Sequence, residues 1–346
     1  MKVVIIGGGL CGSLVAKELD TREELDVTLL DKKDYFEYTP SIPKLLTKSK
    51  YQSKIIVPYT RFLKKTQVLA GTVIQVTPQT VETRNEKIPF DYLVISTGVE
   101  YPILLENKKN VFTVKSGETV IQASDRIKEA TKIVIVGGGL IGTEVAAELS
   151  TKTPEKQIVL VHSQDRLIHR NPMTASNYAA WFLRSHGVEI LYNEKIKHHQ
   201  NGVFITDKKR RIHADVGLWC AGNKANPWFM DKFEKDIFTD DKELRVNQFL
   251  QLQGYRNIFV GGDITDIYEE KTAQNADRHA RLITHNVLHS IQKKPLRTYK
   301  TRITPLIISL GNSNGLITIS GFVLPGFIPG IGKWAVEKFV IGRLLY

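Results

Sequence analysis

The chain of 346 residues has only two cysteines, Cys11 and Cys220, and they form no CxxC pair or similar redox spacing. A disulfide framework is therefore excluded, and this cysteine content predicts a reducing, cytoplasmic compartment. Met1 leads directly into the apolar segment KVVII, so no secretory signal peptide is expected. No run of the sequence approaches the roughly 20 apolar residues that a membrane-spanning helix needs.

Acidic side chains are also scarce relative to basic ones. There are 36 Asp and Glu against 48 Lys and Arg, a formal net charge of +12. Such an excess suits an acidic partner, which would be a phosphorylated cofactor, an anionic lipid or a nucleic acid, and it equally suits a merely basic solvated surface. Hydrophobic residues at 42% and charged residues at 24% are ordinary for a globular protein.

One phrase occurs twice in the chain. Residues 2–19 read KVVIIGGGLCGSLVAKEL, and residues 132–149 read KIVIVGGGLIGTEVAAEL. The copies lie 130 residues apart (Gly7 and Gly137), which is too far for a solenoid repeat. Strand-like runs alternate with helical patterns around both copies, which favours parallel sheets with crossover helices. We therefore predict an α/β fold with two Rossmann-like dinucleotide-binding domains, the second inserted in the first.

The domain bounds follow from this repeat and from changes in composition. We expect the first domain at 1–108 and 244–296, and the inserted domain at 109–243. After residue 296 the chain becomes apolar, rich in Gly and Pro and poor in acid. Residues 297–346 are therefore predicted to form a small C-terminal domain.

The first glycine motif follows a strand and opens a helix. Glycines in a GxGxxG pattern permit a tight turn, close approach of a pyrophosphate and close helix–strand packing, while the helix N-terminus attracts the phosphates. Asp31 ends the next strand, 19 residues after Gly12, where a carboxylate accepts hydrogen bonds from a ribose. The predicted contacts of this loop are Gly7, Gly8, Gly9, Leu10, Cys11 and Gly12.

A second apolar strand, NIFVGGD, indicates which dinucleotide the first domain holds. It places Asp263 where its carboxylate meets ribitol or ribose hydroxyls beside a diphosphate, which favours FAD over NAD. The segments LVISTG, with Thr97 and Gly98, and LWCAG, with Gly222, are the crossover strands that accompany this arrangement.

The second glycine motif consists of Gly137, Gly139 and Gly142, but its next strand ends at His162 instead of an acid. Without a carboxylate a 2′-phosphate is not repelled, and Arg166 is available to pair with it, so we expect NADH or NADPH here. Glu144 lies on the first turn of the following helix and is predicted to face the nicotinamide. Its alternative role is to complement the helix dipole.

These motifs, together with YFEYTPSIPKLL, LVHSQ, ELRVNQFLQLQGYRNIFVGGD and LIISLGNSNG, resemble the flavoprotein reductases with two dinucleotide-binding domains. The similarity runs over roughly residues 2–321 and is strongest to the type II NADH dehydrogenases and the ferroptosis suppressor proteins. It implies FAD contacts at residues 8–12, Lys44, Val73 and Asp263, with Lys44 standing where the suppressor branch has arginine. It also implies that NAD(P)H reduces FAD, which then reduces a quinone.

Further positions follow from the same resemblance. Ala273 and Gln274 match a TAQ segment that type II dehydrogenases place over the flavin, but the quinone-site pattern after it is not kept. His279 matches a histidine of the suppressor branch, and Lys300 matches a lysine that would stabilise reduced flavin. Related enzymes that use a CxxxxC pair or a thiolate relay are excluded by the cysteine positions. No metal site is predicted.

The C-terminal tail combines aromatic and aliphatic residues with Lys333, Lys338 and Arg343. If residues 332–346 are helical, this segment is suited to the interface of a bilayer. The alternative is that the tail packs on its own domain or on a twin subunit, so a homodimer stays open.

Three functions remain at this point. The favoured one is a peripheral membrane NAD(P)H:quinone oxidoreductase that uses FAD. The second is a soluble flavoprotein reductase for a protein acceptor. The third is a redox-sensing binding protein like apoptosis-inducing factor, but nucleic-acid binding is not expected, because the basic run at 208–211 has no interleaved aromatic residues.

Overall fold

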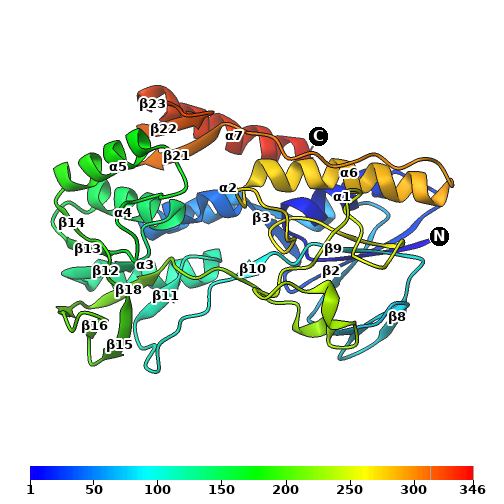
Figure 1. The fold of residues 1–346 in the computed structure, drawn as a ribbon, viewed down its shortest axis with the longest axis horizontal. Coiled ribbons are helices and arrows are strands. Elements are labelled where there is room, and N and C mark those ends of the chain that lie inside the picture. Colours follow the sequence, from blue (N-terminus) through cyan, green and yellow to red (C-terminus); the bar gives the residue numbers. More distant parts are fainter. Residues whose placement is uncertain (312, 346) are drawn as a thin grey trace.

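The computed structural model describes residues 1–311 and 313–345. Two α/β lobes lie side by side, and a small C-terminal unit is laid across them (Figure 1). The first lobe is built on a parallel sheet in the order β20-β9-β1-β2-β5. Its strands are β1 (Lys2–Ile6), β2 (Asp26–Asp31), β5 (Gln67–Ala70), β9 (Tyr92–Ile95) and β20 (Ile258–Val260).

The second lobe repeats this plan. Its sheet is also parallel and has the order β11-β18-β12-β13-β14. The strands are β11 (Val111–Thr113), β12 (Lys132–Val136), β13 (Gln157–Val161), β14 (Val188–Leu191) and β18 (Val216–Trp219). All of them fall between β9 and β20 of the first sheet, so the predicted insertion of one Rossmann-like domain in the other is confirmed. The exact domain bounds stay a prediction.

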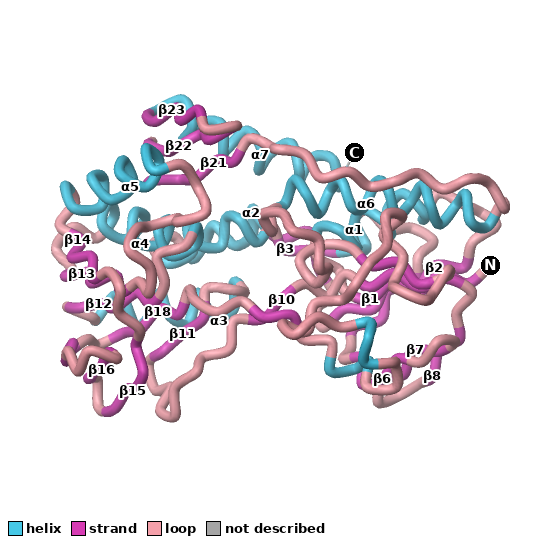
Figure 2. The backbone as a smooth tube through the Cα atoms, in the orientation of Figure 1, coloured by secondary structure: helices cyan, strands magenta, loops and turns pink. Residues whose placement is uncertain are grey.

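Short antiparallel elements complete the two lobes. A ribbon of β10 and β19 lies between them (Figure 2), and each lobe carries a three-stranded antiparallel sheet. These elements are β3 (Tyr35–Glu37), β4 (Ile56–Pro58), β6 (Val73–Val76), β7 (Thr80–Thr83), β8 (Lys87–Pro89), β10 (Val99–Glu100), β15 (Ile196–Gln200), β16 (Val203–Thr206), β17 (Arg211–His213) and β19 (Lys224–Ala225).

The helices cover the sheets. The central strands β1 and β12 are almost wholly buried, because helices and hairpins close both faces of each parallel sheet. The helices are α1 (Leu10–Asp20), α2 (Gln52–Ile55), α3 (Gly117–Glu129), α4 (Leu140–Lys152), α5 (Met173–Ser185) and α6 (Ala273–Ile291). Within the described residues, 3₁₀ helices lie at Thr39–Leu46, Ser49–Tyr51, Tyr59–Arg61, Trp228–Met230 and Lys235–Ile237.

The C-terminal unit is an antiparallel sheet covered by a helix. Its elements are β21 (Leu306–Leu310), β22 (Asn314–Ile319), β23 (Phe322–Gly326) and α7 (Phe327–Leu345). The helix begins five residues before the expected Gly332. Pro329 is compatible with this earlier start because it lies in the first turn, where a missing N–H is tolerated. Two predicted segments, SLGNSNG and the tail, include residues 312 and 346, which lie outside the described residues.

Helix α7 presents charged residues to the protein. Three of its side chains form ion pairs with the two lobes, so the tail packs on its own chain through this face. The pairs are Lys333–Glu144, Glu337–Lys44 and Arg343–Asp277. Among residues 1–311 and 313–345, none of the helices has both the length and the apolar character needed to cross a bilayer.

Candidate functional site

A cavity of about 680 Å³ takes its walls from both lobes and from the C-terminal unit. The first glycine loop, the first turn of α4 and the start of β21 all contribute. Thirteen of the predicted site positions line this cavity. They are Gly7, Gly8, Gly9, Leu10, Cys11, Asp31, Val73, Thr97, Gly98, Glu144, Asp263, Ala273 and Gln274.

The first glycine loop is shaped for a close approach. A Cβ on Gly12 would collide with the Gly7 carbonyl oxygen, so this glycine permits the tight packing of α1 on β1. A Cβ on Gly9 would meet no protein atom within 4 Å, because this residue faces open space. The Gly8 N–H donates to Asp31 Oδ2 at 2.5 Å, so the predicted ribose acid also fixes the loop.

The N-termini of α1 and α4 are left without side-chain caps. Their N-cap residues are Gly9 and Gly139, and neither helix has an acidic residue in its first turn. In contrast, Ser116 caps α3 and Thr272 caps α6 through their hydroxyl oxygens. Free N–H groups and the positive end of the helix dipole make α1 and α4 suited to bind phosphate.

The second glycine loop has the same construction with a different acceptor. A Cβ on Gly142 would collide with the Gly137 carbonyl oxygen, and one on Gly139 would meet no atom within 4 Å. The Gly138 N–H donates to His162 Nδ1 at 3.1 Å, so His162 takes the place that Asp31 has in the first loop. Burial, followed by the neighbouring His169 ring, lowers the pKa of His162, which favours a neutral ring at this position.

Arg166 is engaged elsewhere in the structure. Its guanidinium donates to the backbone carbonyl oxygens of Asn171, at 2.8 Å, and His169. Contact with a 2′-phosphate would require Arg166 to leave these carbonyls. Gly222 follows β18 with φ of 73°, as Gly98 follows β9 with φ of 68°, so the two crossover strands end alike.

Glu144 joins the second lobe to the C-terminal unit. Its Oε1 atom accepts a hydrogen bond from the Ser309 N–H at 2.8 Å and forms an ion pair with Lys333 Nζ. The Glu144 and Lys333 side chains are each 11% exposed. Both line the cavity, so a carboxylate and an ammonium lie together on its wall.

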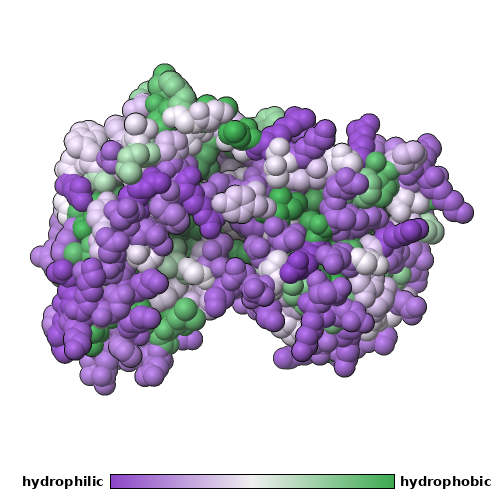
Figure 3. Space-filling model, viewed as in Figure 1, coloured by the Kyte–Doolittle hydropathy of each residue, from purple (hydrophilic) through white to green (hydrophobic). Residues whose placement is uncertain are grey.

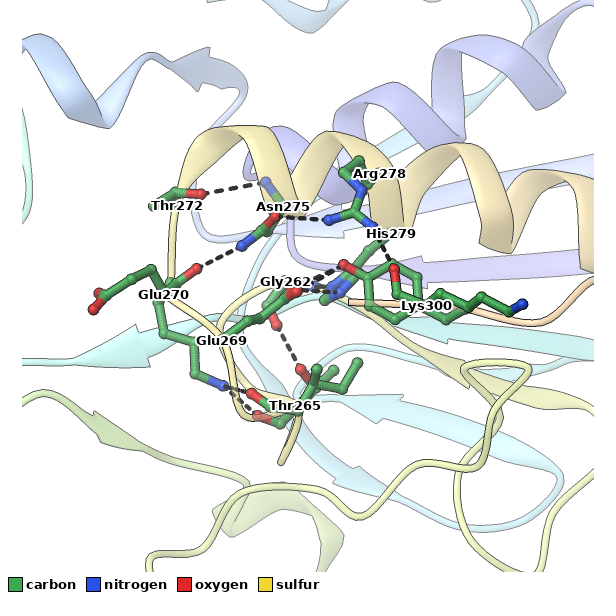
Figure 4. A network of polar contacts seen from close by, with 12 residues as sticks. Gly262, Thr265, Glu269, Glu270, Thr272, Asn275, Arg278, His279 and Lys300 are labelled. Carbon is green, nitrogen blue, oxygen red and sulfur yellow. Dashed lines mark hydrogen bonds and ion pairs between the residues drawn. The ribbon is translucent and has the colours of Figure 1, made fainter. Parts of the chain in front are cut away.

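His279 contacts the loop after β20 that carries Asp263. Its Nδ1 accepts the Gly262 N–H at 3.1 Å, and its Nε2 lies 3.0 Å from Glu269 Oε1 (Figure 4). Tyr299 donates to the same carboxylate at 2.9 Å. Burial raises the pKa of Glu269, but the contacts with His279 and Tyr299 outweigh it and leave the pKa below its ordinary value. His279 therefore supports the Asp263 loop from outside the cavity.

Two lysines that were predicted to contact FAD, Lys44 and Lys300, do not line the cavity. Lys44 Nζ binds Glu337 Oε2 at 2.9 Å, so its charge is used by α7. Lys300 is exposed, and only its carbonyl oxygen joins the network around His279, through Arg278 (Figure 4). The FAD contacts of Lys44 and Lys300 stay predictions, and in this structure both side chains make other contacts or lie exposed.

Sequence reasoning missed the lysines that line the cavity, among them Lys333 and Lys115. Lys333 was noted only as part of the tail, because its partner Glu144 is 189 residues away. Lys115, which follows β11, lines the cavity, and burial lowers its pKa while Asp263 opposes this. Burial raises the pKa of Asp263, and Lys115 opposes that change in turn. No local pattern around Lys115 distinguishes it from a surface lysine.

The cysteines are unsuited to thiol chemistry. Both are free and buried, and burial raises the pKa of Cys220 to about 12 and that of Cys11 further. A thiolate, the reactive form, is therefore disfavoured at both sites. Across residues 1–311 and 313–345, no group of three or more His, Cys, Asp or Glu side chains is arranged to hold a metal ion.

The residues of the cavity fit FAD. The volume lies within the range of cofactor pockets, and the open face of Gly9 leaves room for a diphosphate beside the uncapped α1. Asp31 and Asp263 line the same cavity, where their oxygens are suited to accept hydroxyl protons. The uncapped α4 and the open face of Gly139 offer a second phosphate site of the same kind.

Comparison with known sequences agrees with this geometry. A model of the pyridine nucleotide-disulphide oxidoreductase family matches residues 1–280. Ferroptosis suppressor protein 1 of Mus musculus is 31% identical, and the match covers 96% of this chain and 92% of that protein. Apoptosis-inducing factor homolog B of Dictyostelium discoideum is 30% identical, over 92% of this chain and 89% of its own. The resemblance inferred from the motifs is confirmed.

Solved structures share the whole architecture. The sulfide:quinone oxidoreductase from Aquifex aeolicus has a TM-score of 0.86 at 20% identity, covering 99% of this chain and 91% of that one. NDH2 from Plasmodium falciparum in complex with NADH has a TM-score of 0.86 at 16% identity, covering 99% and 97%. At these identities the likeness concerns the fold, and it extends over the C-terminal unit.

Proposed function

The chain belongs to the pyridine nucleotide-disulphide oxidoreductase family, and we propose that it passes electrons from NAD(P)H through FAD to a quinone at a membrane surface. The coarser part of this statement, an NAD(P)H-dependent flavoprotein oxidoreductase, follows from family membership. One observation carries the proposal. The wall of a single cavity joins the first glycine loop, the first turn of α4 and the inner side of the C-terminal unit.

When bound, FAD accepts a hydride from NAD(P)H and returns two electrons to an acceptor. The protein groups do the binding and orientation. The free N–H groups of α1 hold the diphosphate, and Asp31 and Asp263 hold hydroxyl groups on either side of it. The N–H groups of α4, with Gly139 as N-cap, hold the phosphates of the nicotinamide nucleotide.

Glu144 is proposed to orient the nicotinamide. Glu144 is the fifth residue of α4, just after the first turn, and lines the cavity, where its carboxylate is suited to accept a hydrogen bond from the carboxamide. Lys333 and the Ser309 N–H hold the carboxylate in this place. A carboxylate fixed by two donors on one side keeps its remaining lone pairs for a ligand on the other.

The acceptor is proposed to be a quinone because of the cavity wall beside α7. This part of the wall is mainly apolar, as a planar, lipid-soluble ring requires. The two buried thiols offer no alternative path through a disulfide. The wall residues are Pro305, Leu306, Ile307, Ile308 and Val336.

The membrane surface is proposed from the outer face of the same unit. Helix α7 turns three of its charged side chains, Lys333, Glu337 and Arg343, toward the lobes and leaves large apolar ones exposed, which is unlike an ordinary surface helix. The upper edge of the molecule, over β23 and α7, shows this apolar surface (Figure 3). An exposed apolar surface of this kind suits a bilayer interface. Its residues are Ile319, Phe322, Phe327, Ile328, Ile331, Trp334 and Phe339.

The electron path is tested by reducing the flavin of the purified protein with NADH or NADPH under anaerobic conditions and then adding an acceptor. Rapid return of flavin absorbance with a soluble quinone is expected. Slow return with quinone but fast return with a ferredoxin would instead support a soluble reductase for a protein acceptor. Persistent reduced flavin together with salt-sensitive DNA binding would support a redox-sensing binding protein.

The membrane contact is tested by flotation with vesicles of phosphatidylcholine and phosphatidylglycerol. The wild-type protein is expected to float, and the triple variant Phe327→Ser, Ile331→Ser, Trp334→Ser to remain in solution. Leu104→Ser is the matched control, because Leu104 is 63% exposed but lies in the connection before β11. Equal flotation of the triple variant and the wild type would contradict the membrane proposal and leave the electron path untouched.

A further inference from the structure

Trp228 is a large aromatic residue that lines the cavity without being covered. It begins the 3₁₀ helix Trp228–Met230 and is 50% exposed, whereas Phe229 and Met230 beside it are 4% and 0% exposed. Phe229 contacts the Trp228 ring edge-on, with centroids 6.1 Å apart. The ring is therefore supported by the core from one side and open toward the cavity from the other.

Contacts with β6 locate Trp228 at one end of the cavity. Phe229 and Met230 belong to the same apolar cluster as Val73, the first residue of β6. Gln75 of β6 donates to Asp231 at 3.2 Å, directly after the 3₁₀ helix. Residues 71–73, at the start of β6, line the cavity. These contacts hold the 3₁₀ helix Trp228–Met230 against β6.

That end of the cavity also holds Asp31. The Gly71 N–H donates to the Asp31 carbonyl oxygen at 2.7 Å, which sets residues 71–73 against the end of β2. A second tie comes from Asn226, whose Nδ2 donates to Glu100 Oε2 at 2.8 Å. The other carboxylate oxygen of Glu100 lies 4.0 Å from Lys32 Nζ, next to Asp31 in the chain. These two sets of contacts, one through residues 71–73 and one through Asn226 and Glu100, therefore place Trp228 near Asp31, the predicted ribose ligand.

We propose that the Trp228 indole covers the adenine of FAD. Asp31 marks the adenosine ribose, and the adenine lies beyond this ribose from the diphosphate, between residues 71–73 and the indole. This inference rests on FAD as the flavin and not on the identity of the electron acceptor. A base has a flat face of the size of an indole, and stacking between the two excludes water from both.

Stacking at this position also favours FAD over flavins that lack adenine. FMN and riboflavin have no adenine, so they lose this contact. FMN keeps those of its single phosphate and of the ribityl hydroxyls beside Asp263, and riboflavin keeps only the latter. The indole therefore adds preference for the dinucleotide over the mononucleotide. Alanine substitution of an aromatic residue that stacks on a base weakens binding by roughly 10- to 100-fold.

The experiment uses the full-length protein before and after its FAD is removed. The dissociation constants of FAD, ADP and FMN are measured for the wild type and for Trp228→Ala. We expect Trp228→Ala to weaken FAD and ADP by roughly 10- to 100-fold and to leave FMN within about twofold. Trp181→Ala is the matched control, because Trp181 is 58% exposed on α5 and does not line the cavity.

A fluorescence measurement keeps the test decisive if Trp228→Ala folds poorly. The chain has four tryptophans, so Trp228→Phe removes one emitter while it retains an aromatic ring. ADP is expected to quench the emission of the wild type and of Trp181→Phe, and to have no effect on Trp228→Phe. Quenching that persists in Trp228→Phe, or unchanged FAD and ADP affinity in folded Trp228→Ala, would overturn the proposal. Loss of quinone reduction with unchanged FAD affinity would instead concern the proposed function.

Discussion

Glu144 and Lys333 form an ion pair on the cavity wall, although 189 residues separate them in the chain. Each side chain is 11% exposed. Glu144 belongs to α4, the helix that follows the second glycine motif, and Lys333 belongs to α7, whose outer face is largely apolar. The proposed nicotinamide site and the proposed membrane surface are therefore linked by one pair of charges.

Replacing Lys333 with methionine leaves the Glu144 carboxylate without its cation in a mostly buried place. We expect Lys333→Met to lower the free energy of unfolding by about 2–4 kcal/mol. The double variant Glu144→Gln, Lys333→Met is expected to regain more than half of this loss, because no unpaired charge remains. Urea unfolding of the four members of the mutant cycle measures the coupling.

Lys338→Met is the control for this cycle, since Lys338 is an exposed residue of the same helix. Its free energy of unfolding is expected to stay within about 0.5 kcal/mol of the wild type. If Lys338→Met is as destabilising as Lys333→Met, helix propensity and not the ion pair accounts for the effect.

The two glycine loops are expected to bind different nucleotides, so alanine at each loop should weaken only one of them. Gly9 and Gly139 have φ of −65° and −73°, and a Cβ there meets no protein atom within 4 Å, so alanine is compatible with the fold at both positions. The added methyl group enters the space proposed for a phosphate. We expect Gly139→Ala to raise the KM for NAD(P)H by roughly tenfold while FAD stays bound, and Gly9→Ala to weaken FAD instead.

Flavin content by absorbance and KM by steady-state kinetics distinguish the two variants. Gly12→Ala and Gly142→Ala are the contrasting cases, because their methyl groups collide with the backbone carbonyls of Gly7 and Gly137. Both are expected to lower the melting temperature as well as binding. Equal loss of FAD in Gly9→Ala and Gly139→Ala would contradict the assignment of one loop to each nucleotide.

Glu337 is expected to hold α7 on the two lobes less firmly at acidic pH. It is wholly buried, and burial alone would raise its pKa, but Ser41, Tyr51 and Lys44 bind the carboxylate and lower the pKa below the ordinary 4.5. A carboxyl whose pKa is lower in the folded state stabilises it above the unfolded-state pKa and loses this contribution as the pH falls. We expect Glu337→Gln to destabilise the protein at pH 7 and to differ less from the wild type near pH 4.

Thermal unfolding at the two pH values measures this difference, and the exposed Glu18→Gln on α1 is the control. Limited proteolysis of α7 is expected to become faster in Glu337→Gln at pH 7. A gap between wild type and Glu337→Gln that is the same at pH 7 and pH 4 would show that the charge of Glu337 does not seat the helix.

Sequence patterns predicted the elements whose structure depends on residues close to them in the chain. The two glycine motifs, their strands and helices, Asp31 and Asp263 could be recognised because each is set by residues near it in the chain. The insertion of one domain in the other followed from the repeat. His162 could be placed opposite the second loop for the same reason, since it ends the strand that follows α4.

Long-range partners could not be predicted in this way. Lys44 stands where a related branch has arginine, but in this chain the distant Glu337 takes up its charge. Lys300 is near the flavin segment in sequence, whereas Lys333 reaches the cavity because α7 folds back over both lobes. Nothing in the residues around Trp228 indicates that its ring faces the cavity. Such positions depend on tertiary packing.

The charge at position 162 is expected to decide between NADH and NADPH. His162 accepts the Gly138 N–H as Asp31 accepts the Gly8 N–H, so an aspartate is geometrically compatible at this position. The His162→Asp carboxylate would accept the ribose hydroxyls of NADH and repel a 2′-phosphate. We expect kcat/KM for NADPH to fall roughly 100-fold and that for NADH to stay within about threefold.

His162→Asn separates charge from shape in this test, because an asparagine also accepts the Gly138 N–H but carries no charge. Flavin reduction by each nucleotide, followed by stopped-flow absorbance, gives the two rates for each variant. His162→Asn is expected to use both nucleotides with a ratio within about threefold of the wild type. If it loses NADPH as strongly as His162→Asp does, the imidazole itself, and not the missing negative charge, makes the site tolerant of the 2′-phosphate.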